Sequence, residues 1–142
     1  MARAWCDEQH HWCALTVVMD CCIRELLSWS LSRTGNSKAA EAALEEFLIC
    51  RYGVLNHAQD DLTIRSDNGL VYCSRRFTQT RYLYGIKKDF ILQHAPQRNG
   101  IVERLIQSVK EQCLWLYNFD NLEEARHALK AWCGYYNNHR PH

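Results

Sequence analysis

The chain has 142 residues, of which 47% are hydrophobic and 23% are charged, and its formal net charge is +1. These values are typical of one globular domain with its own hydrophobic core, and they exclude a largely disordered chain. No apolar run reaches the roughly 20 residues of a membrane-spanning helix, and the N-terminus has no signal-peptide pattern. We therefore expect a cytoplasmic protein without a membrane partner.

The N-terminal part of the chain is expected to form three strands. Trp5 and Cys6 end the first strand, residues 12–20 form the second and residues 26–32 form the third. The links between these strands are short, which predicts two antiparallel hairpins in succession. Both faces of the second strand are mostly apolar, so we expect it at the centre of a sheet.

The middle of the chain alternates between helices and strands. Asn36 or Ser37 can cap a helix that Gly53 can end. Residues 62–67 are then expected to form a strand reached through a helix, which is the usual way to place a parallel neighbour.

A second helix is expected to begin at Ser74 and to close at Gly85. A fifth strand follows over residues 86–91. Residues 92–98 include a proline and show no periodicity, which predicts a loop over the candidate site.

Two helices complete the predicted fold. Apolar residues recur at helical spacing after Asn99 and Gly100, up to about Tyr117. Asp120 with Glu123 predicts a capping box for the last helix. The order of elements predicts one α/β domain with a mixed five-stranded sheet, in which three antiparallel strands are followed by parallel ones, and with helices on both faces.

Two carboxylates are distinguished by their place in these elements. Asp67 follows the fourth predicted strand, where the turn dipeptide Asn68-Gly69 opens the chain to solvent. Glu103 falls in the first turn of the next-to-last predicted helix, with Lys110 seven residues later on the same face. A carboxylate at a strand end and another on a nearby helix could share a divalent metal ion.

Thirty-five residues separate Asp67 from Glu103, and the helix of Glu103 starts with the pattern Asn-Gly-x-x-Glu-Arg. Residues 136–142 read Tyr-Asn-Asn-His-Arg-Pro-His. In these features, which occur in order along the whole chain, the sequence resembles the Asp-Asp-Glu transposases of bacterial insertion sequences, relatives of the retroviral integrases. The resemblance implies a ribonuclease-H-like fold and a single catalytic-core domain over residues 1–142 of a bacterial protein.

The resemblance also implies a chemistry. The family uses three carboxylates to hold two Mg²⁺ or Mn²⁺ ions for phosphoryl transfer between DNA strands. By resemblance, Asp67 and Glu103 are the second and third of these catalytic metal ligands, and Asn99, Arg104 and Lys110 contact DNA. The implied partners are DNA, as mobile-element ends and target, and further copies of the chain or a full-length transposase.

The family's first carboxylate lies in the first strand, and an alignment through Trp5 and Cys6 puts it just before Met1. Asp7 falls in the turn after that strand, and we interpret Asp20 as a residue that caps the turn near Arg24. We therefore expect a truncated first strand, no upstream DNA-binding region, and little or no strand transfer by this chain.

Other interpretations of the same residues stay open. Asp67 can simply form a turn, and Glu103 can simply be an acidic residue that favours a helix N-terminus. The segment 65–89 carries a net charge of +4, which suits a phosphodiester partner, but Arg75, Arg76 and Arg81 can equally form a solvated helix face.

Two alternative functions follow. The chain could be a noncatalytic module that binds DNA or a transposase, as the remnant of a mobile element. It could also be a zinc-stabilised interaction domain, because Cys6, His10, His11 and Cys13 are suitable zinc ligands. The eight cysteines include no Cys-x-x-Cys pair, however, and several occupy apolar positions where a reduced cysteine packs as a small hydrophobic residue.

Overall fold

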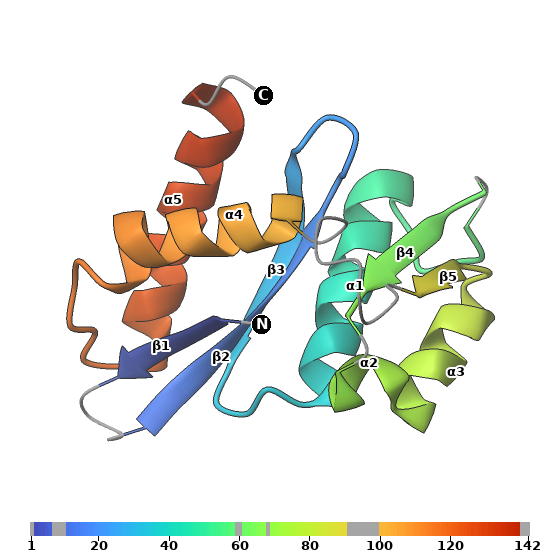
Figure 1. The fold of residues 1–142 in the computed structure, drawn as a ribbon, viewed down its shortest axis with the longest axis horizontal. Helices are drawn as coiled ribbons and strands as arrows, with labels where there is room; N and C mark the ends of the chain where they lie inside the picture. The colour runs from blue at the N-terminus through green and yellow to red at the C-terminus, as the bar shows by residue number, and fades with distance from the viewer. Residues whose placement is uncertain (1, 7–10, 59–60, 68, 91–99, 140–142) are drawn as a thin grey trace.

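Three antiparallel strands open the fold of the computed structural model (Figure 1). They are β1 (Ala2–Cys6), β2 (His11–Met19) and β3 (Leu26–Ser32), and they form a sheet in the order β1-β2-β3. The central place of β2 confirms the prediction from its two apolar faces. The structure describes residues 2–6, 11–58, 61–67, 69–90 and 100–139.

The helix α1 (Ser37–Tyr52) connects this sheet to the rest of the chain. Its first turn is capped by Asn36, whose side chain accepts a hydrogen bond from the backbone N–H of Ala39. It ends at Gly53, which has φ 77°, a left-handed conformation that glycine adopts without steric cost. Both predicted ends of this helix are confirmed.

The next strands, β4 (Thr63–Ser66) and β5 (Lys87–Phe90), pair in parallel, as the sequence predicts. Between them lie α2 (Leu70–Cys73) and α3 (Arg75–Leu83). The Ser74 side chain caps α3 by accepting a hydrogen bond from the N–H of Phe77, as predicted, whereas the short α2 was not predicted.

The C-terminal part consists of α4 (Gly100–Val109), a π-helical turn η3 (Lys110–Leu114) and α5 (Leu122–His139). The α-helix was expected to continue to about Tyr117, and the π-helical turn was not foreseen. The predicted capping box is wrong by one residue. The side chain of Asn121 accepts from the N–H of Glu124, and the Glu124 carboxylate accepts from the N–H of Asp120.

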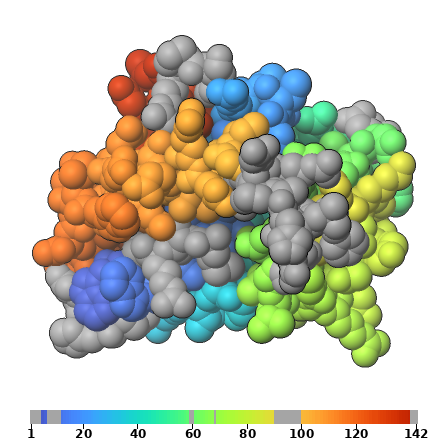
Figure 2. Space-filling view, in the orientation of Figure 1, coloured from blue at the N-terminus to red at the C-terminus, as the bar shows by residue number. Residues whose placement is uncertain are grey.

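Two hydrophobic clusters hold these elements together, one on each face of the β1-β2-β3 sheet. On one face α4, η3 and α5 pack against the sheet, so that β2 and β3 emerge mainly at their ends in the space-filling view (Figure 2). On the other face α1 packs against β2 and β3, and residues of α3 and β4 extend this second cluster. Fully buried members of the two clusters include Cys6, Cys13, Leu15, Leu31, Leu105, Leu129, Leu44, Leu48 and Phe77.

The strands belong to two sheets, which corrects the prediction of a single five-stranded sheet. Within the described ranges, β4 and β5 form a two-stranded sheet of their own. The pairing of β1 with β2 ends where Ala2 lies opposite Leu15, so the rest of β2, residues 16–19, has no strand on that side within the described part of the chain. The α/β class, the mixed strand directions and the helices on both faces are as predicted.

No helix in the described ranges is long and apolar enough to cross a membrane.

Candidate functional site

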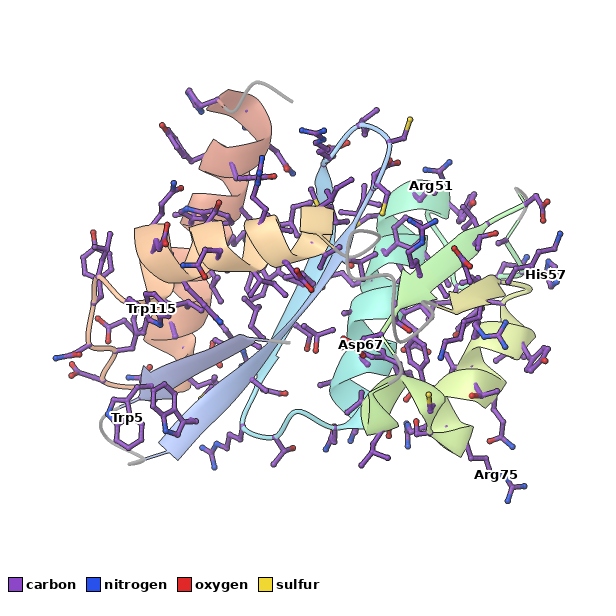
Figure 3. The ribbon with its side chains drawn as sticks, in the orientation of Figure 1. Trp5, Arg51, His57, Asp67, Arg75 and Trp115 are labelled. Carbon is purple, nitrogen blue, oxygen red and sulfur yellow. The ribbon has the colours of Figure 1, made fainter. Side chains whose placement is uncertain are left out.

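Asp67 lies directly after β4, at the point where the chain turns into α2 (Figure 3). Its Oδ1 accepts a hydrogen bond of 2.9 Å from the backbone N–H of Gly69, two residues later. This bond is an Asx turn, in which a short polar side chain replaces a backbone acceptor. The turn-forming role of Asp67 is therefore real, and it engages one of the two carboxylate oxygens.

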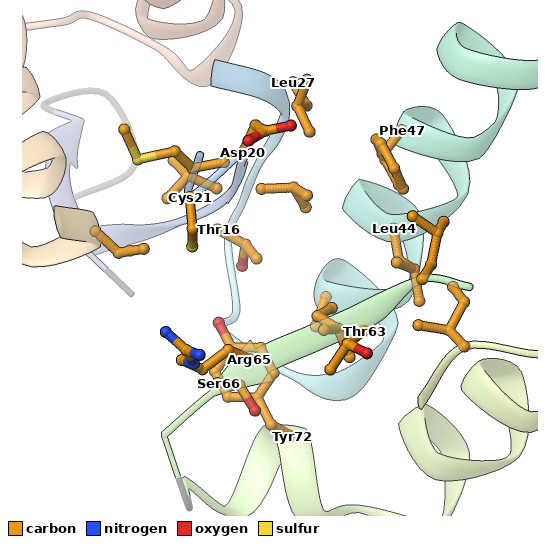
Figure 4. A pocket seen from close by; sticks show the side chains of 18 of the residues that line it. Thr16, Asp20, Cys21, Leu27, Leu44, Phe47, Thr63, Arg65, Ser66 and Tyr72 are labelled. Carbon is orange, nitrogen blue, oxygen red and sulfur yellow. The ribbon is translucent and has the colours of Figure 1, made fainter. Parts of the chain in front are cut away.

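A pocket of about 410 Å³ lies beside Asp67, between β2 and β4 (Figure 4). One of its walls is the apolar face of α1, and the first turns of α4 contribute Val102 and Ile106. Three carboxylates border it, those of Asp20, Asp67 and Asp89.

Asp20 and Asp89 are both engaged in local structure. The Asp20 carboxylate accepts from the backbone N–H groups of Cys22 and Ile23, at 2.7 and 3.1 Å. These bonds confirm the prediction that Asp20 caps the turn between the second and third strands. The Asp89 carboxylate accepts a hydrogen bond of 2.9 Å from the Arg65 guanidinium on the neighbouring strand.

Tyr72 lines the same pocket, and its role was not foreseen from the sequence. Burial raises the pKa of its hydroxyl to about 12, and the negative charge of Asp67 contributes to this rise in pKa. The rise in pKa extends the pH range over which the Tyr72 hydroxyl stays neutral beside the Asp67 charge. Only the position of Tyr72 five residues after Asp67 could have suggested this electrostatic interaction.

Glu103 is exposed on α4, and it does not line the pocket that Asp67 borders. Its neighbours one residue before and three residues after, Val102 and Ile106, do line it. The helix thus reaches the pocket with its apolar face, while Glu103 occupies an adjacent face.

The three residues expected to contact DNA lie in different surroundings. Arg104 is exposed on α4, and Asn99 lies outside the described residues. Lys110 is half-buried at the junction of α4 and η3, and its ammonium lies 5.8 Å from the centroid of the Trp115 ring. This contact is a cation–π interaction, which favours a fixed orientation of the lysine.

The His, Cys, Asp and Glu side chains of the described residues do not form a complete metal site. Throughout the described part of the chain, no three His, Cys, Asp or Glu side chains are grouped so that they could hold a metal ion. Magnesium prefers several oxygen ligands in a near-octahedral arrangement. The residues present therefore do not fit a complete two-ion site.

The basic excess near Asp67 is largely engaged in contacts within the domain. Arg76 pairs with Glu41, and Lys87 pairs with Asp61. Arg81 is only 8% exposed and donates a hydrogen bond of 2.7 Å to a backbone oxygen of the chain segment before β5. Both interpretations of Arg81, as part of a DNA-binding patch or of a solvated helix face, are wrong, because the side chain is buried. Helical spacing in the sequence does not reveal a buried carbonyl that requires a hydrogen-bond donor.

The thiols of Cys6 and Cys13 lie in the core, with their sulfur atoms 3.3 Å apart. Both residues belong to the cluster under α4 and α5, as expected for cysteines that pack as hydrophobic residues. His10, the third residue of the proposed zinc set, lies outside the described residues, and so does the side chain of His11.

Comparisons with known proteins agree along the whole chain. Two family models, both described as integrase core domain, match residues 4–96 and 84–142. Among curated proteins of Escherichia coli, the InsD protein of insertion element IS2E is 24% identical over 99% of this chain and 67% of its own length. The transposase InsD of insertion element IS2D is also 24% identical over 99% of this chain, but this chain spans only 49% of it.

Solved structures with the same fold come from retroviral integrases. The catalytic core domain of BIV integrase has a TM-score of 0.69 and 22% identity, over 100% of this chain and 84% of that one. A chain in the simian T-cell lymphotropic virus intasome with the PP2A subunit B56 gamma has a TM-score of 0.68 and 20% identity, over 98% of this chain and 47% of that one. The HTLV-2 integrase core in complex with magnesium has a TM-score of 0.58 and 20% identity, over 98% of this chain and 82% of that one. These similarities confirm the ribonuclease-H-like fold.

Proposed function

The chain belongs to the integrase core domain family, and from this we propose that it is the core domain of a DNA transposase whose complete form joins DNA strands. The observation that carries the proposal is the position of Asp67, at the end of β4 and on the border of the pocket. The same pocket is bordered by α4, the helix of Glu103. Similarity to insertion-element transposases over 99% of the chain supports the substrate class.

We propose Asp67 and Glu103 as the carboxylates that this chain contributes to a Mg²⁺ or Mn²⁺ site. Carboxylate oxygens suit these hard cations. The Asp67 oxygen that accepts from Gly69 holds the side chain in place, and the other oxygen could bind a cation. The exposure of Glu103 on α4 is compatible with a ligand role.

The chain as it stands is proposed to lack strand-transfer activity. In-line displacement at phosphorus with two metal ions depends on a complete set of ligands. Asp67 and Glu103 are the two ligands proposed for this chain, and no group of three such side chains occurs among the described residues. Asp20 is a poor substitute, because its carboxylate already accepts two backbone hydrogen bonds.

The proposed partner is DNA, as the ends of a mobile element and the target into which they are joined. Arg104, Lys110 and Asn99 are the proposed contacts, because cationic and amide side chains bind phosphate oxygens. The chain is proposed to associate with further copies of itself or with a full-length transposase. Such an assembly would supply the groups that a single core domain lacks. We place the protein in the bacterial cytoplasm, since the curated relatives come from insertion elements of Escherichia coli.

A strand-joining assay tests the proposal. The chain is incubated with duplex oligonucleotides that carry a recessed 3′ end, in Mg²⁺ or in Mn²⁺, and the products are separated by length. We expect no joined product from this chain, and we expect Mn²⁺ binding, measured by electron paramagnetic resonance, to be weak and to be weakened further by Glu103→Gln. A joined product that Glu103→Gln abolishes would overturn the proposed inactivity.

The incomplete ligand set of the described residues favours one alternative, a noncatalytic module that binds DNA or a transposase. The two proposals predict different effects of the chain on the strand-joining rate of an active family member. A module of this kind would lower strand joining when it is added to an active relative, whereas an isolated defective core with no partner would leave that rate unchanged.

A further inference from the structure

Four of the eight cysteines are buried, and all four belong to one hydrophobic cluster. They are Cys6, Cys13, Cys113 and Cys133, in the cluster that α4, η3 and α5 form against the β1-β2-β3 sheet. Reduced cysteines often pack in this way as small hydrophobic residues. The positions of Cys6 and Cys13 relative to each other also allow a chemical reaction between them.

Cys6 and Cys13 lie on neighbouring strands, with their side chains on the same face of the sheet. In the antiparallel register Cys6 is opposite His11 and Cys13 is opposite Ala4, so the two cysteines are diagonal neighbours. Their Sγ atoms are 3.3 Å apart, and one thiol donates a hydrogen bond to the other. Both residues are 0% exposed, so the two sulfur atoms face each other within the core.

A disulfide between these two sulfur atoms requires a small movement. An S–S bond is about 2.0 Å long, so the two atoms must approach each other by about 1.3 Å. Rotation of the side chains and a small shift between the two strands provide this approach. Cys6 is the last residue of β1, where a shift disturbs the fewest ladder hydrogen bonds.

Cys6 also connects the β1-β2 hairpin to the C-terminal part of the chain. Its backbone forms a bridge with Phe119, in the segment that leads from η3 into α5 (Figure 1). Phe119 is fully buried and belongs to the same cluster. A bond from Cys6 to Cys13 would therefore tie β2, through the end of β1, to the start of the C-terminal helix.

We propose that Cys6 and Cys13 are a redox modification site, at which a hydroperoxide converts the two thiols into a disulfide that locks β1 to β2. One thiolate attacks the peroxide, so that an S–O bond forms, the O–O bond breaks, and water or an alcohol leaves. The second sulfur then attacks the resulting sulfenic acid, which forms the S–S bond and releases water. The two cysteines together lose two electrons and two protons, and the peroxide gains them.

Burial determines when this reaction occurs. The thiols react when the end of the hairpin opens locally, so their oxidation is slower than that of the exposed cysteines. In a reducing compartment the pair stays reduced until a peroxide is present. The inference depends on the geometry of the two thiols and holds whether or not the chain acts on DNA.

A variant without exposed thiols tests the proposal. It carries the substitutions Cys21→Ser, Cys22→Ser, Cys50→Ser and Cys73→Ser, all at exposed positions. After treatment with hydrogen peroxide, we expect two thiols in denaturant instead of four, and we expect dithiothreitol to restore all four. Four thiols after the treatment, or a disulfide between two copies of the chain, would overturn the proposal.

Peptide mapping identifies the bond. Cleavage after Glu8 by a glutamate-specific protease places Cys6 and Cys13 in separate peptides, which only a disulfide keeps together. The linked peptides should disappear with Cys13→Ala and persist with the matched control Cys113→Ala, which removes another buried thiol of the same cluster. A bond between Cys113 and Cys133 instead would overturn the assignment. If Cys13→Ala does not fold, the peptides of the unsubstituted pair still decide between these bonds.

Thermal unfolding measures the lock. A disulfide that closes a short loop, here over residues 6–13, restricts the unfolded chain. The oxidised variant should therefore have a Tm higher than that of the reduced variant by at least about 4 °C. The same treatment of the variant with Cys13→Ala should give no such rise. An unchanged or lower Tm after formation of the bond would overturn the proposed lock.

Discussion

Asn137 attaches the C-terminal helix to the first residue of β3 through both the oxygen and the nitrogen of its side-chain amide. Its Oδ1 accepts from the Leu26 N–H at 3.0 Å, and its Nδ2 donates to the Leu26 carbonyl at 2.9 Å. These bonds give a structural reason for an asparagine in the block at residues 136–142. A side chain that satisfies a backbone donor and acceptor in this way acts like the residue of a neighbouring strand.

Asn137→Ala should therefore lower the free energy of unfolding by about 1–3 kcal/mol, because two backbone groups lose their partners. Denaturation in urea measures this change. Asn138→Ala is the matched control, since Asn138 is exposed and its side chain donates within its own helix, to the Gly134 carbonyl. A similar loss in both variants would contradict the proposed attachment.

The ionisation of Tyr72 is linked to the stability of the fold. Its pKa is raised from 10.0 to about 12 in the folded protein, so the folded state retains a proton that the unfolded state has lost. The contribution of the neutral hydroxyl is complete below pH 10 and is lost as the pH rises from about 10 to 12. Tyr72→Phe should remove this part of the alkaline loss of stability, as measured by urea denaturation at pH 9 to 12. Tyr135→Phe, at a 59% exposed position, should leave that loss unchanged.

The cysteines differ in accessibility, and chemical modification can test this difference. Cys21, Cys22, Cys50 and Cys73 are exposed, whereas the other four are buried. Burial raises the pKa of the Cys133 thiol to about 12 and also raises that of Cys113, so both stay protonated and unreactive at neutral pH. Ellman's reagent should react quickly with four thiols in the native protein and with all eight in denaturant. Fast reaction of more than four would contradict the burial of the other four.

At the level of single elements, glycines that look alike in the sequence have opposite roles. Gly85 has φ 67° between α3 and β5, and a Cβ there would lie 2.0 Å from an atom of the His57 ring. Gly134 lies in the middle of α5, where a Cβ would meet no atom within 4 Å. Gly85 is therefore required by the chain path, and Gly134 only weakens its helix.

Substitution by alanine should accordingly change stability in opposite directions. Gly85→Ala should destabilise the fold by about 1–2 kcal/mol, because a left-handed conformation is unfavourable for residues with a Cβ. Gly134→Ala should stabilise it by about 0.5–1 kcal/mol, because alanine favours a helix interior. Thermal unfolding of the two variants measures both signs, and a shift in the same direction for both would refute this explanation.

The attachment of α5 to the sheet also shows which contacts sequence patterns do not predict. Helical spacing identified the apolar face of α5, and the capping pattern identified its start to within one residue. The guanidinium of Arg126 donates to the Leu31 carbonyl, at 2.9 and 3.2 Å, across 95 positions of sequence. No local pattern predicts a contact of this kind, because its acceptor is a backbone group of a distant strand.

At the scale of the whole molecule, the charge distribution limits affinity for DNA. The net charge is +1, and Arg65, Arg76 and Lys87 are paired with carboxylates. Binding to duplex DNA depends largely on unpaired cationic side chains near phosphates. The isolated chain should therefore bind duplex DNA with a Kd in the range of about 10⁻⁴–10⁻⁶ M at physiological salt, as expected for nonspecific binding. Fluorescence anisotropy measures this, and nanomolar binding at that salt concentration would contradict it.

The sequence by itself determined most of the secondary structure and the family. Caps at Asn36, Gly53 and Ser74 lie where predicted, because a cap depends on residues within one turn of the chain. The resemblance to the Asp-Asp-Glu transposases, which depends on several motifs in order along the chain, implied the ribonuclease-H-like fold, which the comparisons confirm. The assignment of these two carboxylates as catalytic ligands stays a prediction.

Only the tertiary structure decided how the strands associate and what surrounds Asp67. The sequence predicted five strands but not their division into two sheets, because pairing depends on backbone edges that are distant along the chain. The burial of Arg81, the raised pKa of Tyr72 and the unpaired hydroxyls of Thr16 and Ser66 within the described residues likewise result from contacts between separate elements. Local patterns report on neighbours within a few residues, whereas burial and electrostatic environment are properties of the assembled fold.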